Sequence, residues 1–158
     1  MATPKFQSEE ALHGQICDYL KLQYREVVFR SDHEAGRKRH PAEQGKIKRL
    51  NSSRAWPDLF LAEPRAGFHG LFIEIKKQGT RIKKRDGHYV ADPHVREQAL
   101  MLHTLGTHGY MATFGIGFDH CKDIIDEYLA LPKPNYTPPE YNVTLPEPTK
   151  EPDDGSPF

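Results

Sequence analysis

The chain has 158 residues, 37% of them hydrophobic and 28% charged, which suits one domain with its own core. No apolar run approaches the roughly 18 residues of a membrane span, and Cys17 and Cys121 do not form a paired motif, so a membrane protein and a disulfide-built scaffold are excluded. The N-terminus is polar and lacks the apolar segment of a signal peptide. We therefore expect a cytoplasmic protein with no membrane partner.

The formal net charge of zero hides two basic clusters. The first lies in residues 37–54 and the second in residues 76–85. Such clusters suit a polyanion, because each phosphate contact adds salt-dependent affinity. An ordinary solvated loop surface is the alternative, and it is the stronger interpretation for either cluster taken alone. The basic residues are Arg37, Lys38, Arg39, Lys46, Lys48, Arg49 and Arg54, then Lys76, Lys77, Arg81, Lys83, Lys84 and Arg85.

The first predicted element is a helix that opens at Ser8. Ser8 is a suitable N-cap, and the acidic Glu9 and Glu10 follow in the first turn, where the helix dipole favours them. The apolar stripe of this helix consists of Leu12, Ile16, Tyr19 and Leu20. A short strand is predicted over residues 26–30. Residues 31–55 have turn formers and charge but no periodicity, and they predict a long basic loop.

Two strands and a loop are predicted next, over residues 58–62, 70–76 and 78–92. The loop can form a hairpin around Asp86-Gly87. A helix is then predicted from Asp92, with Pro93 as its first residue, to about Thr107. A strand over residues 110–116 and a last helix capped by Asp119 complete the order, which predicts an α/β fold with a small central mixed sheet flanked by helices.

The last 28 residues form a separate predicted region. Residues 131–158 hold eight of the 13 prolines, with five acidic residues against two basic ones. This composition predicts a disordered, acidic tail that favours the polyproline conformation, after a domain of residues 1–130. The tail is a candidate for binding a protein partner.

Acidic residues stand in two of the predicted strands. Asp58 opens the first, and Glu74 lies inside the second between Ile73 and Ile75. Side chains in a strand alternate with a period of two, so Glu74 and Lys76 point to the same face. A carboxylate inside such a strand is costly to bury unless it is paired or binds a metal. An Asp, a Glu and a Lys brought together can bind a divalent cation and activate a water.

Pro57-Asp58 followed by Glu74-Ile75-Lys76 resembles the PD-(D/E)XK nuclease superfamily, and most of all its VRR-NUC branch of small phage and bacterial proteins. The resemblance covers about residues 8–130 and includes an early helical Glu and Gln98 on the helix after Lys76. Two features depart from the branch. Trp56 stands where a glycine often precedes Pro-Asp, and the connection from Lys76 to Asp92 is long and basic.

The resemblance implies a restriction-endonuclease-like core and a role for each residue. Asp58, Glu74 and the backbone carbonyl of Ile75 would bind Mg²⁺ or Mn²⁺, with Glu10, or its rival Glu9, as a further ligand. Lys76 would orient the attacking water, and Gln98 would hydrogen-bond to that water or to Lys76. Each has a plainer reading: a turn carboxylate for Asp58, an exposed strand pair for Glu74 and Lys76, dipole compensation for Glu10, and a surface helix residue for Gln98.

The function implied by the resemblance is a metal-dependent DNA endonuclease. The expected substrates are branched or flapped DNA, the expected assembly is a homodimer, and a phage-encoded enzyme would act in the host cytoplasm. The alternative is a nucleic-acid-binding module that keeps the nuclease fold without the chemistry. A restriction-type enzyme with base-specific cleavage is a third reading, but 158 residues leave little room for a recognition domain.

Overall fold

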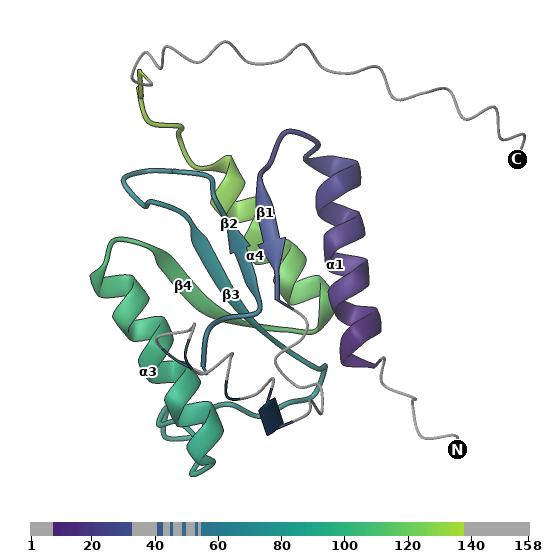
Figure 1. Ribbon diagram of the computed structural model, residues 1–158, viewed down its shortest axis with the longest axis vertical. Helices are drawn as coiled ribbons and strands as arrows, with labels where there is room; N and C mark the ends of the chain where they lie inside the picture. The colour runs from purple at the N-terminus through teal and green to yellow at the C-terminus, as the bar shows by residue number, and fades with distance from the viewer. Residues whose placement is uncertain are drawn as a thin grey trace, which may run out of the picture.

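The computed structural model describes residues 8–32, 41, 42, 45, 49, 53 and 55–137. Within them the chain forms a four-stranded sheet with helices on both faces (Figure 1). The strands lie in the order β1-β2-β3-β4; the first two pairs are antiparallel and β3 and β4 are parallel. The fold is therefore the predicted α/β arrangement with a mixed sheet. Its strands are β1 (Phe29–Ser31), β2 (Leu59–Leu61), β3 (Leu71–Lys76) and β4 (Met111–Ile116).

The first helix, α1 (Glu9–Gln23), begins as the sequence predicts. The Ser8 hydroxyl accepts a hydrogen bond from the backbone N–H of Ala11 at 3.2 Å, which satisfies one of the unpaired N–H groups of the first turn. Leu12, Ile16 and Leu20 are buried, as expected from their helical spacing. The helix therefore presents one apolar face to the sheet.

The second predicted element and the loop after it differ from the structure. Strand β1 covers Phe29–Ser31, whereas residues 26–30 were expected to be extended. The backbone is helical at positions 41, 42, 45 and 49, inside the segment predicted as a loop without regular structure. The rest of residues 33–52 lies outside the described residues, so the prediction there stays open.

Helix α3 (Pro93–Thr107) matches its predicted bounds, and Asp92 Oδ1 caps it by accepting hydrogen bonds from the N–H groups of His94 and Val95. Before it, the predicted hairpin is present as a bridge between Lys83 and Tyr89. Helix α4 (Gly117–Ala130) corrects the prediction that Asp119 is its cap. Asp119 lies in the first turn, because the helix begins two residues earlier, and the N–H of Ile116 before the helix donates to His120 Nδ1 at 3.1 Å.

Two apolar cores lie on opposite faces of the sheet. On one face, α4 packs against β3 and β4, α1 packs against α4, and their apolar side chains form one core with Leu59, Ile73 and Ile125, which are fully buried. On the other, α3 packs against β3 and β4 around Leu102 and Phe114. Because β3 is central and covered on both sides, a charged side chain within it is removed from water.

Within the described ranges, no helix is long and apolar enough to cross a membrane. Helix α4 ends at Ala130, where the predicted tail begins. Residues 138–158 lie outside the described residues, and the division into a domain and a tail stays a prediction.

Candidate active site

The sheet brings Asp58, Glu74 and Lys76 together at one end. Asp58 immediately precedes β2, and Glu74 and Lys76 lie near the end of β3. Asp58 Oδ2 accepts a hydrogen bond of 2.8 Å from the backbone N–H of Ile75, so the short strand β2 is held to β3 beyond its last ladder pair, Leu59 with Ile73. The ladder and this bond together place the two carboxyl groups side by side.

Glu74 is the centre of the cluster and is 3% exposed. Its Oε1 accepts hydrogen bonds from Lys76 Nζ at 2.9 Å and from Nε2 of Gln98, which is also buried. Gln98 is therefore a buried contact of Glu74 and not the surface residue of the alternative reading. The Gln98 amide nitrogen also lies 3.1 Å from His94 Nε2, one turn earlier on α3.

Burial changes the acidity of both carboxyl groups. Burial, and after it the negative charge of Asp58, raise the pKa of Glu74 to about 8, although Lys76 acts in the opposite direction. Burial also raises the pKa of Asp58, against the hydrogen bond from Ile75 and the positive charges of His13 and Lys76. When both buried carboxyl groups are ionised, they carry more negative charge than their one lysine partner can balance. A cation would therefore stabilise their ionised forms.

The comparisons with known proteins found a similar fold among the solved structures. A solved structure described as "VRR_NUC domain protein" superposes with a TM-score of 0.57 and 27% sequence identity, and the match covers 82% of this chain and 93% of that one. This likeness supports the assignment of the chain to the VRR-NUC family. No family model matches the sequence, and no curated protein matches it.

The likeness to the VRR_NUC domain protein indicates a nuclease-like domain, in which the first helix was expected to supply an acidic residue. Glu10 and Glu9 are exposed in the first turn of α1, and Glu9 lies 3.8 Å from Lys77. One turn later, His13 is buried and its charge acts on Asp58. Across the part of the chain that the structure describes, no group of three His, Cys, Asp or Glu residues is arranged to bind a metal. The metal-binding role of Glu10 therefore stays a prediction.

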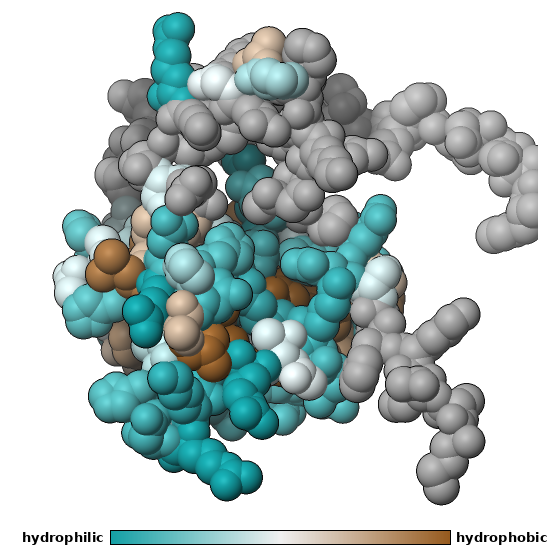
Figure 2. All heavy atoms as spheres, turned by 90° about the horizontal axis from the view of Figure 1, so that it is seen from below, coloured by the Kyte–Doolittle hydropathy of each residue, from teal (hydrophilic) through white to brown (hydrophobic). Residues whose placement is uncertain are grey.

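The second basic cluster is exposed apart from Lys76, which is half-buried at the site. Lys77, Arg81, Lys83, Lys84 and Arg85 lie on the connection between β3 and α3, and the surface seen from that end is mainly hydrophilic with small apolar areas (Figure 2). Of the first cluster, Arg49 is exposed. Arg37, Lys38, Arg39, Lys46, Lys48 and Arg54 lie outside the described residues, so their DNA-binding role stays a prediction.

The sequence interpretation missed His13 and His94. His13 follows Leu12 on the apolar side of α1, so a polar residue facing the core was the available signal. His94 precedes Gln98 by four residues, which on a helix places two side chains next to each other. Neither signal identifies a site without the position of Glu74, because both depend on which side of each helix faces the sheet.

Proposed function

We propose that this protein is a divalent-metal-dependent DNA endonuclease that hydrolyses phosphodiester bonds in branched or otherwise structured DNA. The observation that supports this most directly is the buried cluster of Asp58, Glu74, Lys76 and Gln98 at one end of the sheet. Burying these groups is costly, so their convergence needs a chemical reason.

The donor set fits Mg²⁺ or Mn²⁺. These hard cations prefer oxygen ligands, and Mg²⁺ is commonly bound by one or two carboxylates together with waters and substrate phosphates. Asp58 and Glu74 supply two carboxylates. The N–H and C=O of one strand residue point to the same neighbouring strand, so the Ile75 carbonyl faces the same side as its N–H, which donates to Asp58. In addition, the buried Gln98 Oε1 has no hydrogen-bond partner among the described residues, which suits a bound water.

Each side chain has a defined task in this proposal. A bound metal would polarise the scissile phosphate and lower the pKa of a water. Lys76 orients that water and offsets the negative charge that develops on the phosphate. The Gln98 amide holds Glu74 in place through its hydrogen bond, and the N–H of Ile75 does the same for Asp58.

The exposed cations beside the site support DNA as the substrate. The connection from Lys76 to α3 contributes five exposed basic side chains, from Lys77 to Arg85, and residues 37–54 are expected to add a second group. Such cations bind the phosphate backbone without regard to base sequence. The preference for branched DNA and a homodimeric enzyme with two sites are part of the proposal and come from the family resemblance.

The test compares the purified protein with its Glu74→Gln variant on plasmid, flap and four-way-junction DNA, in Mg²⁺, in Mn²⁺ and in EDTA. We expect cleavage that requires the metal and is lost in Glu74→Gln. Glu127→Gln is the matched control, because Glu127 is exposed on α4. A melting temperature that rises with Mn²⁺ in the wild type but not in Glu74→Gln would report the metal independently of activity.

Binding of these DNAs without cleavage, in every metal tried, would contradict the proposal. It would favour the second candidate, a binding module that keeps the nuclease fold. Full cleavage by Glu74→Gln would exclude this cluster as the active site.

A further inference from the structure

Trp56 is the only tryptophan of the chain and an exposed one. It is 42% exposed and precedes Pro57-Asp58, so it stands two residues before one of the proposed metal ligands. Most large aromatic side chains of a small domain are buried in its core, and an exposed one beside a reactive site points to a ligand. The proposed chemistry does not use Trp56.

Trp56 is the outer end of a row of aromatic rings on one face of the sheet. The centroids of the Trp56 and Phe72 rings are 5.5 Å apart and their planes meet at 87°, so one ring meets the other by its edge. Phe72 in turn stacks on Phe60 at 4.4 Å, and Tyr110 meets both of these rings by an edge. The row supports Trp56 from below and keeps the indole at the surface.

This row and Glu74 lie on the same face. Phe72 and Glu74 are two residues apart on β3, so their side chains point the same way and their positions are about 7 Å apart along the strand. A DNA strand with a phosphate at Glu74 and Lys76 would therefore pass beside the Trp56 ring.

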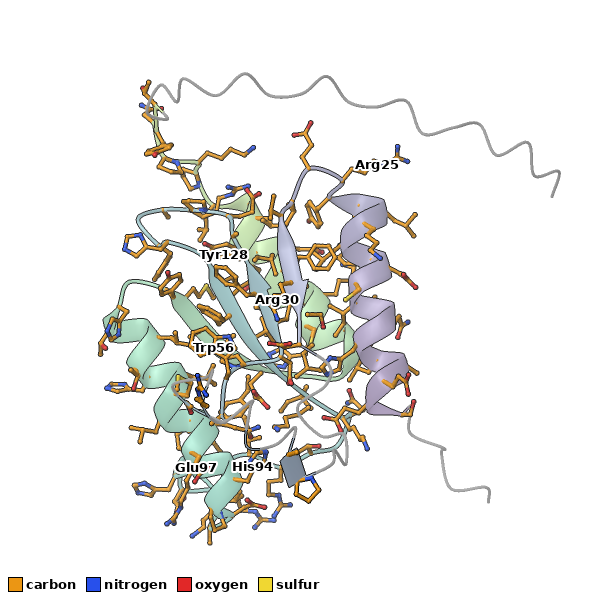
Figure 3. All side chains as sticks on the ribbon, viewed as in Figure 1. Arg25, Arg30, Trp56, His94, Glu97 and Tyr128 are labelled. Carbon is orange, nitrogen blue, oxygen red and sulfur yellow. The ribbon has the colours of Figure 1, made fainter. Side chains whose placement is uncertain are left out.

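A cation lies on the far side of the row. Arg30 of β1 pairs with Phe60 in the ladder, and residues directly opposite in a ladder point to the same face. Its side chain is 78% exposed and forms an ion pair of 3.5 Å with Asp32. Figure 3 labels Trp56 and Arg30, and both lie over the sheet in this view. An aromatic ring and a guanidinium group are thus displayed on the same face of the sheet as Glu74.

We propose that Trp56 and Arg30 bind an unpaired nucleotide of the DNA substrate, with the base stacked on the indole and a phosphate at the guanidinium group. This inference rests on the proposed function and specifies its substrate as DNA with a single-stranded part beside the cut. Every base has a flat face, so the stacking is independent of sequence. A base inside an intact duplex has no free face to offer, so Trp56 would distinguish flapped from blunt DNA.

The same features argue against a protein partner at this place. Within the row of rings, only Trp56 is exposed: Phe72 beneath it is 3% exposed, and Phe60 and Tyr110 are half-buried. One projecting ring with a neighbouring cation suits a nucleotide, whereas a second copy of the chain would need a wide apolar surface.

The single tryptophan makes the test direct, because intrinsic tryptophan fluorescence reports on position 56 alone. The Glu74→Gln variant, in EDTA, is titrated with a blunt duplex and with the same duplex carrying a flap, and the anisotropy of the labelled DNA reports binding in parallel. We expect the flap to quench the emission and the blunt duplex to leave it nearly unchanged. In the same background, Trp56→Ala should weaken flap binding about tenfold, the effect of losing one stacked base, and Trp56→Phe should restore most of it.

Two further variants separate stacking from packing. Trp56→Leu keeps an apolar side chain against Phe72 but removes the stacking face, so it should bind the flap as weakly as Trp56→Ala. Phe68→Ala is the matched control, because Phe68 is 38% exposed but lies in the turn between β2 and β3. Melting temperatures identify any variant that has lost its fold.

Saturating flap binding with unchanged tryptophan emission, equal quenching by the blunt duplex, or wild-type flap affinity in Trp56→Ala would each overturn this inference. If one of these results is obtained while Glu74→Gln still abolishes cleavage, only the inference about Trp56 and Arg30 fails and the proposed function stands. Cleavage that survives in Glu74→Gln would instead remove the proposed function.

Discussion

The Asp58 carboxylate accepts a hydrogen bond of 2.8 Å from the backbone N–H of Ile75. This bond continues the pairing of β2 with β3 where the ladder itself has ended. Asp58 therefore has a structural task as well as its proposed chemical one, and substitutions at position 58 should separate the two.

Asp58→Asn should keep the fold and lose metal-dependent cleavage, because the amide oxygen can still accept the Ile75 N–H but carries no charge. Asp58→Ala should lose cleavage and also reduce the free energy of unfolding by about 1–3 kcal/mol, since the buried N–H loses its partner. Urea denaturation of the two variants measures the difference. Equal stability of Asp58→Asn and Asp58→Ala would show that the bond contributes little.

The pKa of Glu74 predicts how the metal-free protein responds to pH. Burial and Asp58 raise this pKa from 4.5 to about 8, so between these values the folded chain binds more protons than the unfolded chain. The stabilisation is complete below pH 4.5 and is lost as the pH rises through about 8. The melting temperature in EDTA should therefore fall from pH 5 to pH 8.5 more steeply for the wild type than for Glu74→Gln. Parallel curves for the two proteins would contradict the raised pKa.

Gln98 should act through Glu74 without being a ligand itself. Gln98→Met keeps the volume of the side chain but removes the hydrogen bond to Glu74, and loss of such a supporting contact commonly costs about 10–100-fold in metal affinity or activity. Cleavage rates against Mn²⁺ concentration would show this loss. Gln15→Met, on the exposed side of α1, is the control and should keep the wild-type rate. A wild-type rate for Gln98→Met would remove Gln98 from the site.

Gly115 on β4 marks where α4 packs against the sheet. A Cβ atom at this position would collide with Cys121 Sγ and lie 2.9 Å from Ile73 Cγ2, so Gly115→Ala should cost about 1–3 kcal/mol of stability. Gly14→Ala is the matched change, because nothing lies within 4 Å of its Cβ position in α1. That variant should be more stable by about 1 kcal/mol. Urea denaturation measures the free energy of unfolding of both variants, which should fall for Gly115→Ala and rise for Gly14→Ala. An unchanged free energy for Gly115→Ala would show that α4 can shift.

By itself, the sequence determined the order of the elements and where most of them begin. Local signals carry this information: Ser8 and Asp92 cap their helices, and the run from Leu71 to Lys76 has the composition of a buried strand. Local signals were wrong for Asp119 because α4 begins two residues earlier, at Gly117, which places Asp119 inside the first turn. They were also wrong for the start of β1, whose bounds depend on its partner β2.

Only the tertiary structure decided which polar groups meet. Glu74, Gln98 and His94 come from a strand and the helix that packs on it, and their contacts depend on the register of the sheet and the rotation of α3. The same holds for α1, where packing buries His13 and leaves Glu10 in water. The spacing of residues along a chain determines faces, whereas packing alone determines which faces are brought together. For this reason the sequence could propose Asp58, Glu74 and Lys76 as a site, but the acidity of that site and the aromatic row beside it followed from the fold.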